Sequence, residues 1–283
     1  MNDLLVDAAW LASHRGEVVV ADVRWSATGG TGEAERAFEA GHIPGAVFFD
    51  VDRDLAGVPF VDGPGRHPLP DPERFAAMLA ASGVASGDRV VAYDDGVGSV
   101  AARLWWMLDA IGTRCALLDG GLAAWEGPLE TGPAAARSPV QTSIRPWPED
   151  RLADADGVAA ALRSGEVVID ARVGERYRGE TEPIDPVAGH IPGAINRFWQ
   201  QNLNPDGRFK APKQLRDEFE ELLGSDTGRT VHMCGSGVTA CHNAFAMELA
   251  GLPAGRLYPG SWSEWVSDPA RPVATATPTT PKK

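Results

Sequence analysis

Cys234 is the residue of this chain whose surroundings are best suited to nucleophilic chemistry. It opens the segment Cys-Gly-Ser-Gly-Val-Thr-Ala at residues 234–240, directly after the hydrophobic run 230–233 and before an apolar pattern with helical spacing. A loop between a strand and the start of a helix directs several backbone N–H groups, and the positive end of the helix dipole, toward one point. A thiol at that point is stabilised as the thiolate, which is the nucleophilic form of cysteine. We therefore predict a reactive cysteine at this position.

The residues that follow Cys234 are suited to holding a negatively charged sulfur atom. Glycines at two of these positions allow backbone conformations that other residues avoid. Consecutive N–H groups in such a turn form a concave site for anions. An ordinary buried cysteine is the alternative, which the crowding of glycines around the thiol argues against. We predict a cradle made by the N–H groups of Gly235, Ser236, Gly237, Val238 and Thr239.

A protein phosphatase is another class of enzyme that places a cysteine in such a loop. That chemistry needs an arginine at the sixth position after the cysteine, because the planar guanidinium group holds the phosphate through two hydrogen bonds. The sixth residue after Cys234 is Ala240, and residues 234–240 contain no lysine or arginine. The charge of the loop therefore excludes a phosphatase of this kind.

Several motifs occur twice, and the repeat predicts the architecture. Asp-x-Arg begins at residues 22 and 170, and His-Ile-Pro-Gly-Ala begins at 42 and 190, so both motifs recur after 148 residues. A later segment, 117–125, recurs at 257–265, an offset of 140. A repeat of this length indicates two domains, since solenoid repeats are only about 20–50 residues long. With the second offset Asp94 falls opposite Cys234, so at most one of the two domains is catalytic.

The expected elements within each copy indicate an α/β fold. Apolar, β-branched runs at 18–20, 89–93, 167–169 and 230–233 alternate with helix-like patterns, which is typical of parallel sheets covered by helices on both faces. We predict a non-catalytic domain at residues 1–128 and a catalytic domain at 151–272. The aperiodic segments 129–150 and 273–283 are predicted to be a linker and a disordered tail. We expect the site in the crevice between the domains, beyond the carboxyl ends of the strands.

Composition narrows the possible partners. The 283 residues carry a net charge of −13, which argues against nucleic acid or an anionic membrane as a general partner. No apolar run approaches the ~18 residues of a membrane helix, and the first residues do not read as a signal peptide. Three cysteines do not suggest a disulfide framework, so we expect a reducing, cytoplasmic location.

Together, the two His-Ile-Pro-Gly-Ala motifs, the loop at 234–240 and the segment Gly-Ser-Trp-Ser-Glu-Trp at 260–265 resemble the tandem-domain rhodanese family. Within it they resemble the 3-mercaptopyruvate sulfurtransferase branch. The resemblance covers the chain from about Val18 to Trp265. It implies two rhodanese-type domains, a catalytic cysteine in the second only, and a persulfide intermediate without a metal or organic cofactor. A small donor gives a sulfur atom to Cys234, and cyanide or a thiol, with a thiol redox protein as one candidate, removes it.

The resemblance also suggests how the donor is processed. Thiosulfate-preferring relatives carry basic residues just after the cysteine, whereas Gly235 and Ser236 resemble the mercaptopyruvate branch. Ser236 can then pass a proton to the pyruvate enolate, with His42 behind it and Glu33 orienting His42, in the order of a catalytic triad. His190 occupies the same motif in the second copy, so a purely structural turn is the alternative role for His42.

The expected carboxylate site departs from the family in one respect. Arg176 matches the family arginine that contacts the substrate, but the second arginine usual before the second His-Ile-Pro-Gly motif is missing at residues 184–187. Losing one charge-assisted contact costs about 1.5–3 kcal/mol. Thiosulfate is therefore the alternative donor. A sulfur-carrier or redox module loaded by a partner protein, and an inactive scaffold, are the rival functions. Cys115 and Cys241 are expected to pack in the core, with a redox role for Cys241 as the alternative.

Overall fold

Runs of β-branched residues form the strands of two separate parallel sheets. The structure, a computed structural model, describes residues 4–25, 32–57, 65–135, 137–224 and 227–275. The first sheet has the order β1-β5-β4-β2-β3 and the second the order β7-β6-β8-β9. The strands are β1 (Leu5–Val6), β2 (Val19–Asp22), β3 (Val47–Phe48), β4 (Arg89–Tyr93) and β5 (Arg114–Leu118) in the first sheet, and β6 (Val167–Asp170), β7 (Ile195–Asn196), β8 (Thr230–Met233) and β9 (Arg256–Leu257) in the second.

Helices cover both faces of each sheet, because successive strand residues point to opposite sides. Val20 and Val91 pack toward α1 and α2, whereas Val19 and Val90 pack toward α3 and α4. The first domain contains α1 (Ala8–His14), α2 (Glu33–Ala40), α3 (Pro72–Ala81), α4 (Ala101–Ala110) and the 3₁₀ turn η1 (Gly121–Ala124). The second contains η2 (Glu149–Arg151), α5 (Ala155–Arg163), α6 (Gly174–Arg178), η3 (Trp199–Asn202), α7 (Pro212–Leu223), α8 (Ala240–Leu249) and α9 (Ser261–Trp265). The predicted fold class is confirmed.

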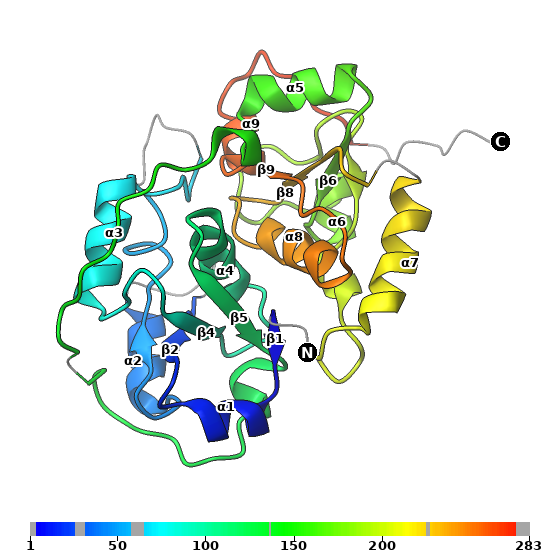
Figure 1. The fold of residues 1–283 in the computed structure, drawn as a ribbon. Helices are drawn as coiled ribbons and strands as arrows, with labels where there is room; N and C mark the ends of the chain where they lie inside the picture. The colour runs from blue at the N-terminus through cyan, green and yellow to red at the C-terminus, as the bar shows by residue number, and fades with distance from the viewer. Residues whose placement is uncertain (1–3, 26–31, 58–64, 136, 225–226, 276–283) are drawn as a thin grey trace.

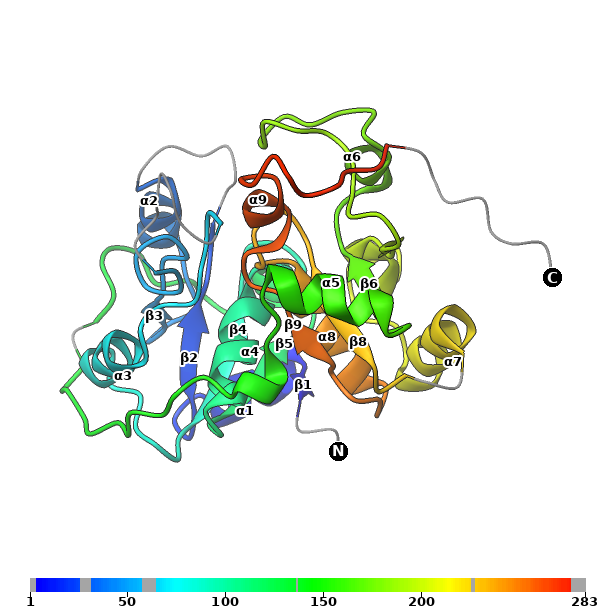
Figure 2. The ribbon, with the colours of Figure 1, turned by 90° about the horizontal axis from the view of Figure 1, so that it is seen from above.

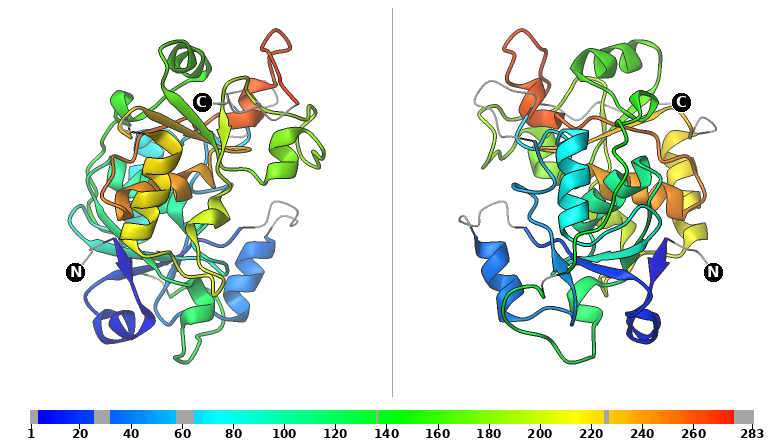
Figure 3. Two further views of the ribbon diagram at one scale, coloured as in Figure 1. Left: turned by 90° about the vertical axis from the view of Figure 1, so that its right-hand side faces the viewer. Right: turned by 60° about the vertical axis from the view of Figure 1, so that its left-hand side comes forward.

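The two domains meet through the helices that follow the two equivalent loops. α4 and α8 lie against each other at the centre of the molecule (Figures 1 and 2). Trp105 on α4 meets Phe245 on α8 edge to face, with ring centroids 4.9 Å apart, and both side chains are completely buried. α3 and α7 lie on the outer sides of the two domains (Figure 3). One continuous hydrophobic core therefore joins the domains behind the loops.

The repeated His-Ile-Pro-Gly motif forms the same structural turn in both domains. The ring of His42 stacks on Phe38 at 3.7 Å, and its Nδ1 lies 2.9 Å from the carbonyl oxygen of Phe38. In the second domain His190 stacks on Tyr177 at 3.9 Å, with Nδ1 2.8 Å from the Tyr177 carbonyl oxygen. The backbone of each histidine also pairs with a segment that follows the domain, at Glu130 and Ala274. The motif thus fixes the end of each domain against its core.

The segments predicted as linker and tail are partly anchored. In residues 129–150, the indole Nε1 of Trp147 donates a hydrogen bond to Pro70 O at 2.8 Å, and the ring packs beside Phe75. Ala274 pairs with His190, so the beginning of the predicted tail is held, while residues 276–283 lie outside the described residues. The boundaries at 128 and 151 stay predictions. None of the helices in the described ranges has the length and apolar character needed to cross a membrane.

Candidate active site

Cys234 lies at the carboxyl end of β8 and directly before the loop that leads into α8. Its side chain is only 2% exposed, and Gly237 donates its N–H to the sulfur at 3.1 Å. Gly237 has φ +79°, and a Cβ atom there would lie 2.4 Å from Pro259 O, so only glycine fits. The Cys234 N–H donates to the hydroxyl of Ser261 at 3.1 Å, which braces the loop against α9. The Gly-Ser-Trp-Ser-Glu-Trp segment therefore supports the cysteine loop.

The equivalent loop of the first domain is already occupied by a carboxylate. Tyr93 and Met233 end the two equivalent strands, and Ala101 and Ala240 begin the two helices, so the first loop is one residue longer. Asp94 stands where Cys234 stands in the second domain. Its two carboxylate oxygens accept four backbone hydrogen bonds of 2.8–3.0 Å, from Gly96, Gly98, Val100 and Ala101. Burial raises the pKa of Asp94, and the hydrogen bonds from Ala101, Gly98 and Val100 oppose this rise. The N–H groups of a loop of this design therefore favour a negatively charged group at this position.

A hydrogen-bonded chain from the first domain reaches Ser236, next to the cysteine. His67 Nδ1 lies 2.7 Å from Ser236 Oγ, and His67 Nε2 lies 2.8 Å from Asp52 Oδ1. Trp25 donates its indole N–H to the same carboxylate at 3.1 Å, and its ring meets His67 edge-on. The hydrogen bond from His67 holds the pKa of Asp52 below its usual value. Asp52 therefore stays ionised and orients the imidazole.

The predicted relay through His42 and Glu33 is wrong. The ring of His42 is completely buried and stacks on Phe38, and its Nε2 lies 3.8 Å from Glu130 in the segment that follows the domain. Glu33 is an exposed residue at the start of α2 and has no contact with Ser236 among the described residues. The resemblance suggested His42 for the relay, but its motif forms the same structural turn in both domains, which is the alternative role that the recurrence at His190 indicates.

Sequence reasoning missed His67 because it belongs to neither of the repeated motifs that define the two copies nor to a periodic element. It stands in the segment Gly-Arg-His-Pro-Leu-Pro at residues 65–70, and the corresponding segment of the second copy, Gly-Arg-Phe-Lys-Ala-Pro at residues 207–212, has phenylalanine in place of the histidine. A histidine that occurs in only one of two repeated domains indicates a catalytic residue, because only one of the two domains carries the reactive cysteine and the residues that serve it need not be repeated. Asp52 follows a strand end and offered no comparable pattern.

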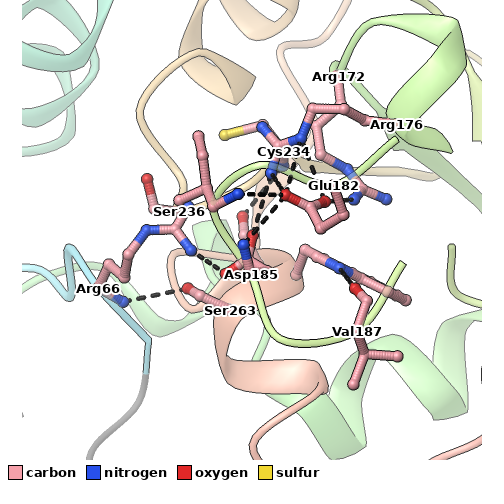
Figure 4. A network of polar contacts seen from close by, with 12 residues as sticks. Arg66, Arg172, Arg176, Glu182, Asp185, Val187, Cys234, Ser236 and Ser263 are labelled. Carbon is pink, nitrogen blue, oxygen red and sulfur yellow. Dashed lines mark hydrogen bonds and ion pairs between the residues drawn. The ribbon is translucent and has the colours of Figure 1, made fainter. Parts of the chain in front are cut away.

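Two arginines, Arg66 from the first domain and Arg176 from the second, lie beside the cysteine loop, and Figure 4 shows both with Cys234 and Asp185. A Cβ atom on Gly235 would lie 3.0 Å from Arg66 Nη2 and 3.5 Å from Arg176 Nη1. Arg176 bonds Glu182 at 2.6 Å and Asp185 at 3.1 Å, and Arg66 also bonds Asp185. Arg176 therefore lies beside the loop, and glycine at 235 leaves room for both guanidinium groups; the role of Arg176 in binding the substrate stays a prediction.

The acidic partners of these arginines lie in a partly buried network. Burial raises the pKa of Asp185, whereas Arg66 and Arg176 oppose this rise. Burial also acts to raise the pKa of Glu182, but the hydrogen bonds from Arg176 hold it below its usual value. Both groups are therefore tied to arginines, and their main effect is to fix where the guanidinium groups point.

A third arginine, Arg103, contacts the cysteine loop from its buried side. Arg103 on α4 is completely buried, and its guanidinium donates to three backbone carbonyl oxygens, those of Gly237, Leu55 and His67. Its Nε has no partner, and among the described residues it forms no ion pair with a carboxylate. Burial lowers the pKa of Arg103, but the sulfur atoms of Cys234 and Cys241 act against this. Since arginine keeps its charge even when buried, it places a positive charge behind the reactive sulfur.

The other cysteines are buried thiols, as predicted. Burial raises the pKa of Cys241 to about 12, and its Sγ donates to Gly237 O at 3.4 Å. Burial raises the pKa of Cys115 even further. Neither group is a thiolate at neutral pH. In the part of the chain that the structure describes, no three His, Cys, Asp or Glu side chains gather in a way that could hold a metal ion.

Comparisons with known proteins agree with this geometry. The family of the rhodanese-like domain matches residues 6–128 and again 154–268. A probable 3-mercaptopyruvate sulfurtransferase of Pseudomonas aeruginosa is 49% identical over 250 residues, with 85% of this chain and 86% of the relative covered. A putative thiosulfate sulfurtransferase of Mycobacterium tuberculosis is 39% identical, with 98% of each chain covered.

Among solved structures, 3-mercaptopyruvate sulfurtransferase from Leishmania major superimposes with a TM-score of 0.79 at 28% identity. The match covers 94% of this chain and 75% of the Leishmania chain. These similarities confirm the resemblance drawn from the motifs, while the two bacterial relatives are named after different donors.

Proposed function

Because the chain belongs to the rhodanese-like domain family and contains two copies of the domain, we propose that it is a sulfurtransferase. It moves a sulfur atom from 3-mercaptopyruvate to cyanide or a thiol through a persulfide on Cys234. The observation that carries this proposal is the Ser236–His67–Asp52 chain beside a cysteine whose loop is built to hold an anion. When 3-mercaptopyruvate gives up its sulfur, the remaining group leaves as an enolate, and a proton relay can supply the proton that this enolate needs.

The first half-reaction loads the sulfur. The Cys234 thiolate attacks the donor's sulfur, an S–S bond forms, and the C–S bond breaks with its electron pair left on the methylene carbon. Ser236 passes the donor's thiol proton to His67, whose Nε2–H is held by Asp52. The same relay then returns this proton to the methylene carbon, so the products are the persulfide anion and pyruvate.

The loop supports the loaded state. The sulfur bonded to Cβ keeps the N–H of Gly237, at the position equivalent to Gly98 in the first domain. The N–H groups of Thr239 and Ala240, equivalent to the two donors that hold the second oxygen of Asp94, receive the outer sulfur. In the second half-reaction an acceptor thiolate or cyanide attacks that outer sulfur, and the Cys234 thiolate leaves. A thiol redox protein is one acceptor of this chemistry.

A steady-state assay with cyanide as acceptor tests the proposal on wild type and Cys234→Ser. We expect thiocyanate formation with 3-mercaptopyruvate, and none above background in the serine variant. Thiosulfate is the second candidate donor, because two guanidinium groups beside the loop also suit a dianion. Turnover with neither donor would contradict the proposal and favour a carrier loaded by a partner protein.

Mass spectrometry after treatment with donor alone identifies the carrier atom. We expect one additional sulfur on the peptide containing Cys234 and none on that containing Cys115, since the Cys115 thiol is buried and protonated. Sulfur found on Cys115, or on both peptides equally, would contradict a single persulfide site.

A further inference from the structure

Ser261, the first residue of α9, has an unfavourable backbone conformation. Its φ is +52°, and within the described part of the chain it is the only residue other than glycine with a positive φ. This left-handed region is costly for serine because its Cβ atom crowds the following carbonyl oxygen. Such strain persists only where the surrounding structure imposes it, and it is concentrated at functional sites. The side chain of Ser261 is also completely buried, so it has a defined place in the core.

The first domain has a glycine at the equivalent position. Gly121 precedes Ser261 by 140 residues and has φ +58°, so both domains make the same turn. A Cβ atom on Gly121 would lie 2.2 Å from Gly96 O and 2.7 Å from Asp94 O, both in the loop equivalent to the cysteine loop. The first domain therefore has neither the strain nor room for a side chain. The catalytic domain keeps both the strain and the side chain.

The hydroxyl group of Ser261 links the end of β8 to the turn before α9. It accepts a hydrogen bond from the backbone N–H of Cys234 at 3.1 Å and donates one to Tyr258 O at 2.8 Å. Both hydrogen-bonding functions of the hydroxyl are therefore used, and one of them acts directly on the reactive cysteine.

The bond to the Cys234 N–H distinguishes the catalytic domain from its twin. The backbone contact between turn and loop is shared, since Trp262 donates its N–H to Cys234 O at 3.0 Å and Leu122 donates equivalently to Asp94 O at 2.8 Å. The side-chain contact made by Ser261 has no counterpart in the first domain, because glycine has no hydroxyl group. The additional contact thus occurs in the domain whose loop begins with a cysteine.

We propose that Ser261 is a positioning residue for the sulfur-carrying cysteine. Its hydroxyl fixes the orientation of the peptide group before Cys234, and thereby the direction in which the thiol leaves the backbone. The strained conformation is what brings the hydroxyl to this N–H group. The inference rests on the proposed function, in which Cys234 carries the sulfur, and adds a residue that acts on the cysteine through its backbone. It also accounts for a strained serine where the first domain has glycine.

Two substitutions separate the hydroxyl from the strain. Ser261→Ala removes the hydroxyl but keeps the Cβ atom that makes the left-handed backbone unfavourable, whereas Ser261→Gly removes both. Because glycine adopts this conformation without strain, we expect Ser261→Gly to melt about 2–4 °C above Ser261→Ala. Thermal unfolding followed by circular dichroism measures this difference.

The reactivity of Cys234 should not follow the order of stability. In alkylation by iodoacetamide the sulfur bonds the methylene carbon and iodide leaves, and mass spectrometry of the peptide containing Cys234 gives the rate. We expect this rate at pH 7 to fall about tenfold in both variants, because both lose the acceptor for the Cys234 N–H, and one hydrogen bond is of this scale. If Ser261 served stability alone, the more stable Ser261→Gly would instead react faster than Ser261→Ala.

Ser164→Ala and Ser164→Gly are the matched controls. Ser164 is another second-domain serine whose hydroxyl donates to a backbone carbonyl oxygen, that of Ala161 at 2.9 Å. Both controls should react at the wild-type rate. All rates are compared at a temperature where circular dichroism shows every variant folded.

The outcomes for Ser261 and for the proposed function are distinguishable, because alkylation does not require sulfur transfer. A wild-type alkylation rate in Ser261→Gly overturns the inference, as does a rate that recovers together with the melting temperature. If wild type transfers sulfur from no donor while alkylation still depends on Ser261, the proposed function fails and the positioning role stands. If wild type transfers sulfur but both Ser261 variants are alkylated at its rate, the positioning role fails and the proposed function stands.

Discussion

Ser236 follows the reactive cysteine by two residues, yet its chemical partners come from the other domain. His67 and Asp52 give it a path for a proton, which matters only for a donor whose leaving group must be protonated. We therefore propose that different residues govern two properties of the site: Cys234 and the N–H groups of its loop bind the sulfur, and the chain Ser236–His67–Asp52 governs the choice of donor.

Replacing a relay residue should change donor preference. In Ser236→Ala and Asp52→Asn we expect kcat/KM with 3-mercaptopyruvate to fall about 100-fold or more, the usual scale of general acid–base catalysis, and the value with thiosulfate to fall much less. Steady-state kinetics with both donors measure this. His42→Gln is the control, because His42 is a structural residue and should leave the donor ratio unchanged. Equal losses with both donors would remove the relay from the mechanism.

The buried charge of Arg103 should support the thiolate. In Arg103→Met we expect the alkylation of Cys234 by iodoacetamide at pH 7 to slow about tenfold, equivalent to roughly 1.4 kcal/mol. Arg103→Lys keeps a positive charge and should retain most of the rate, although it loses part of the hydrogen bonding to the carbonyl groups of Gly237 and His67. The same slow rate in both variants would indicate that shape, not charge, is what Arg103 contributes.

At the scale of elements, two buried histidines of the second domain contribute to how its stability depends on pH. Burial lowers the pKa of His232 on β8 to about 4 and that of His242 on α8 to about 3. Below pH 6.5 the unfolded chain binds protons at both positions and the folded chain does not. Stability therefore falls as the pH decreases from about 6.5 toward 4.

Urea unfolding of His242→Gln at pH 7 and pH 5 tests this dependence. The wild-type free energy of unfolding should drop by about 2 kcal/mol for each of the two histidines between these pH values, and the variant should lose one of these contributions. Met247→Leu, on the same helix, is a control without a titrating group. An unchanged pH dependence in His242→Gln would contradict the interpretation.

The sequence predicted the elements better than the contacts between them. The β-branched run before Cys234 and the helical pattern after it correctly located β8 and α8, because both are continuous in the chain and strictly buried. The site depends on Asp52, Arg66 and His67 of the first domain meeting Gly235 and Ser236 of the second, and no local pattern encodes that meeting. The sequence shows that residues 234–240 contain no basic side chain. It does not show that three arginines from other segments, Arg66, Arg103 and Arg176, lie next to this loop.

At the scale of the whole molecule, the α4–α8 contact keeps the two halves of the site together. In Phe245→Ala we expect a loss of about 3–5 kcal/mol in stability, and a lower kcat/KM with both donors, since Arg66 and His67 shift relative to Cys234. Phe219→Ala is the matched control: this ring is equally buried but packs in the second domain beside Arg197. Both variants are to be compared where circular dichroism shows them folded.

Asp94 determines how many sulfur atoms one chain can hold. Each chain contains two loops of the same design. The side chain of Asp94, which can neither leave nor react, permanently fills the first loop. However large the excess of donor, each chain should store a single sulfur atom, and cold cyanolysis of donor-saturated protein should release one thiocyanate per chain. The first domain therefore adds no second sulfur-binding site. It contributes part of its surface to the site of the second domain, which takes up a sulfur atom and releases it again.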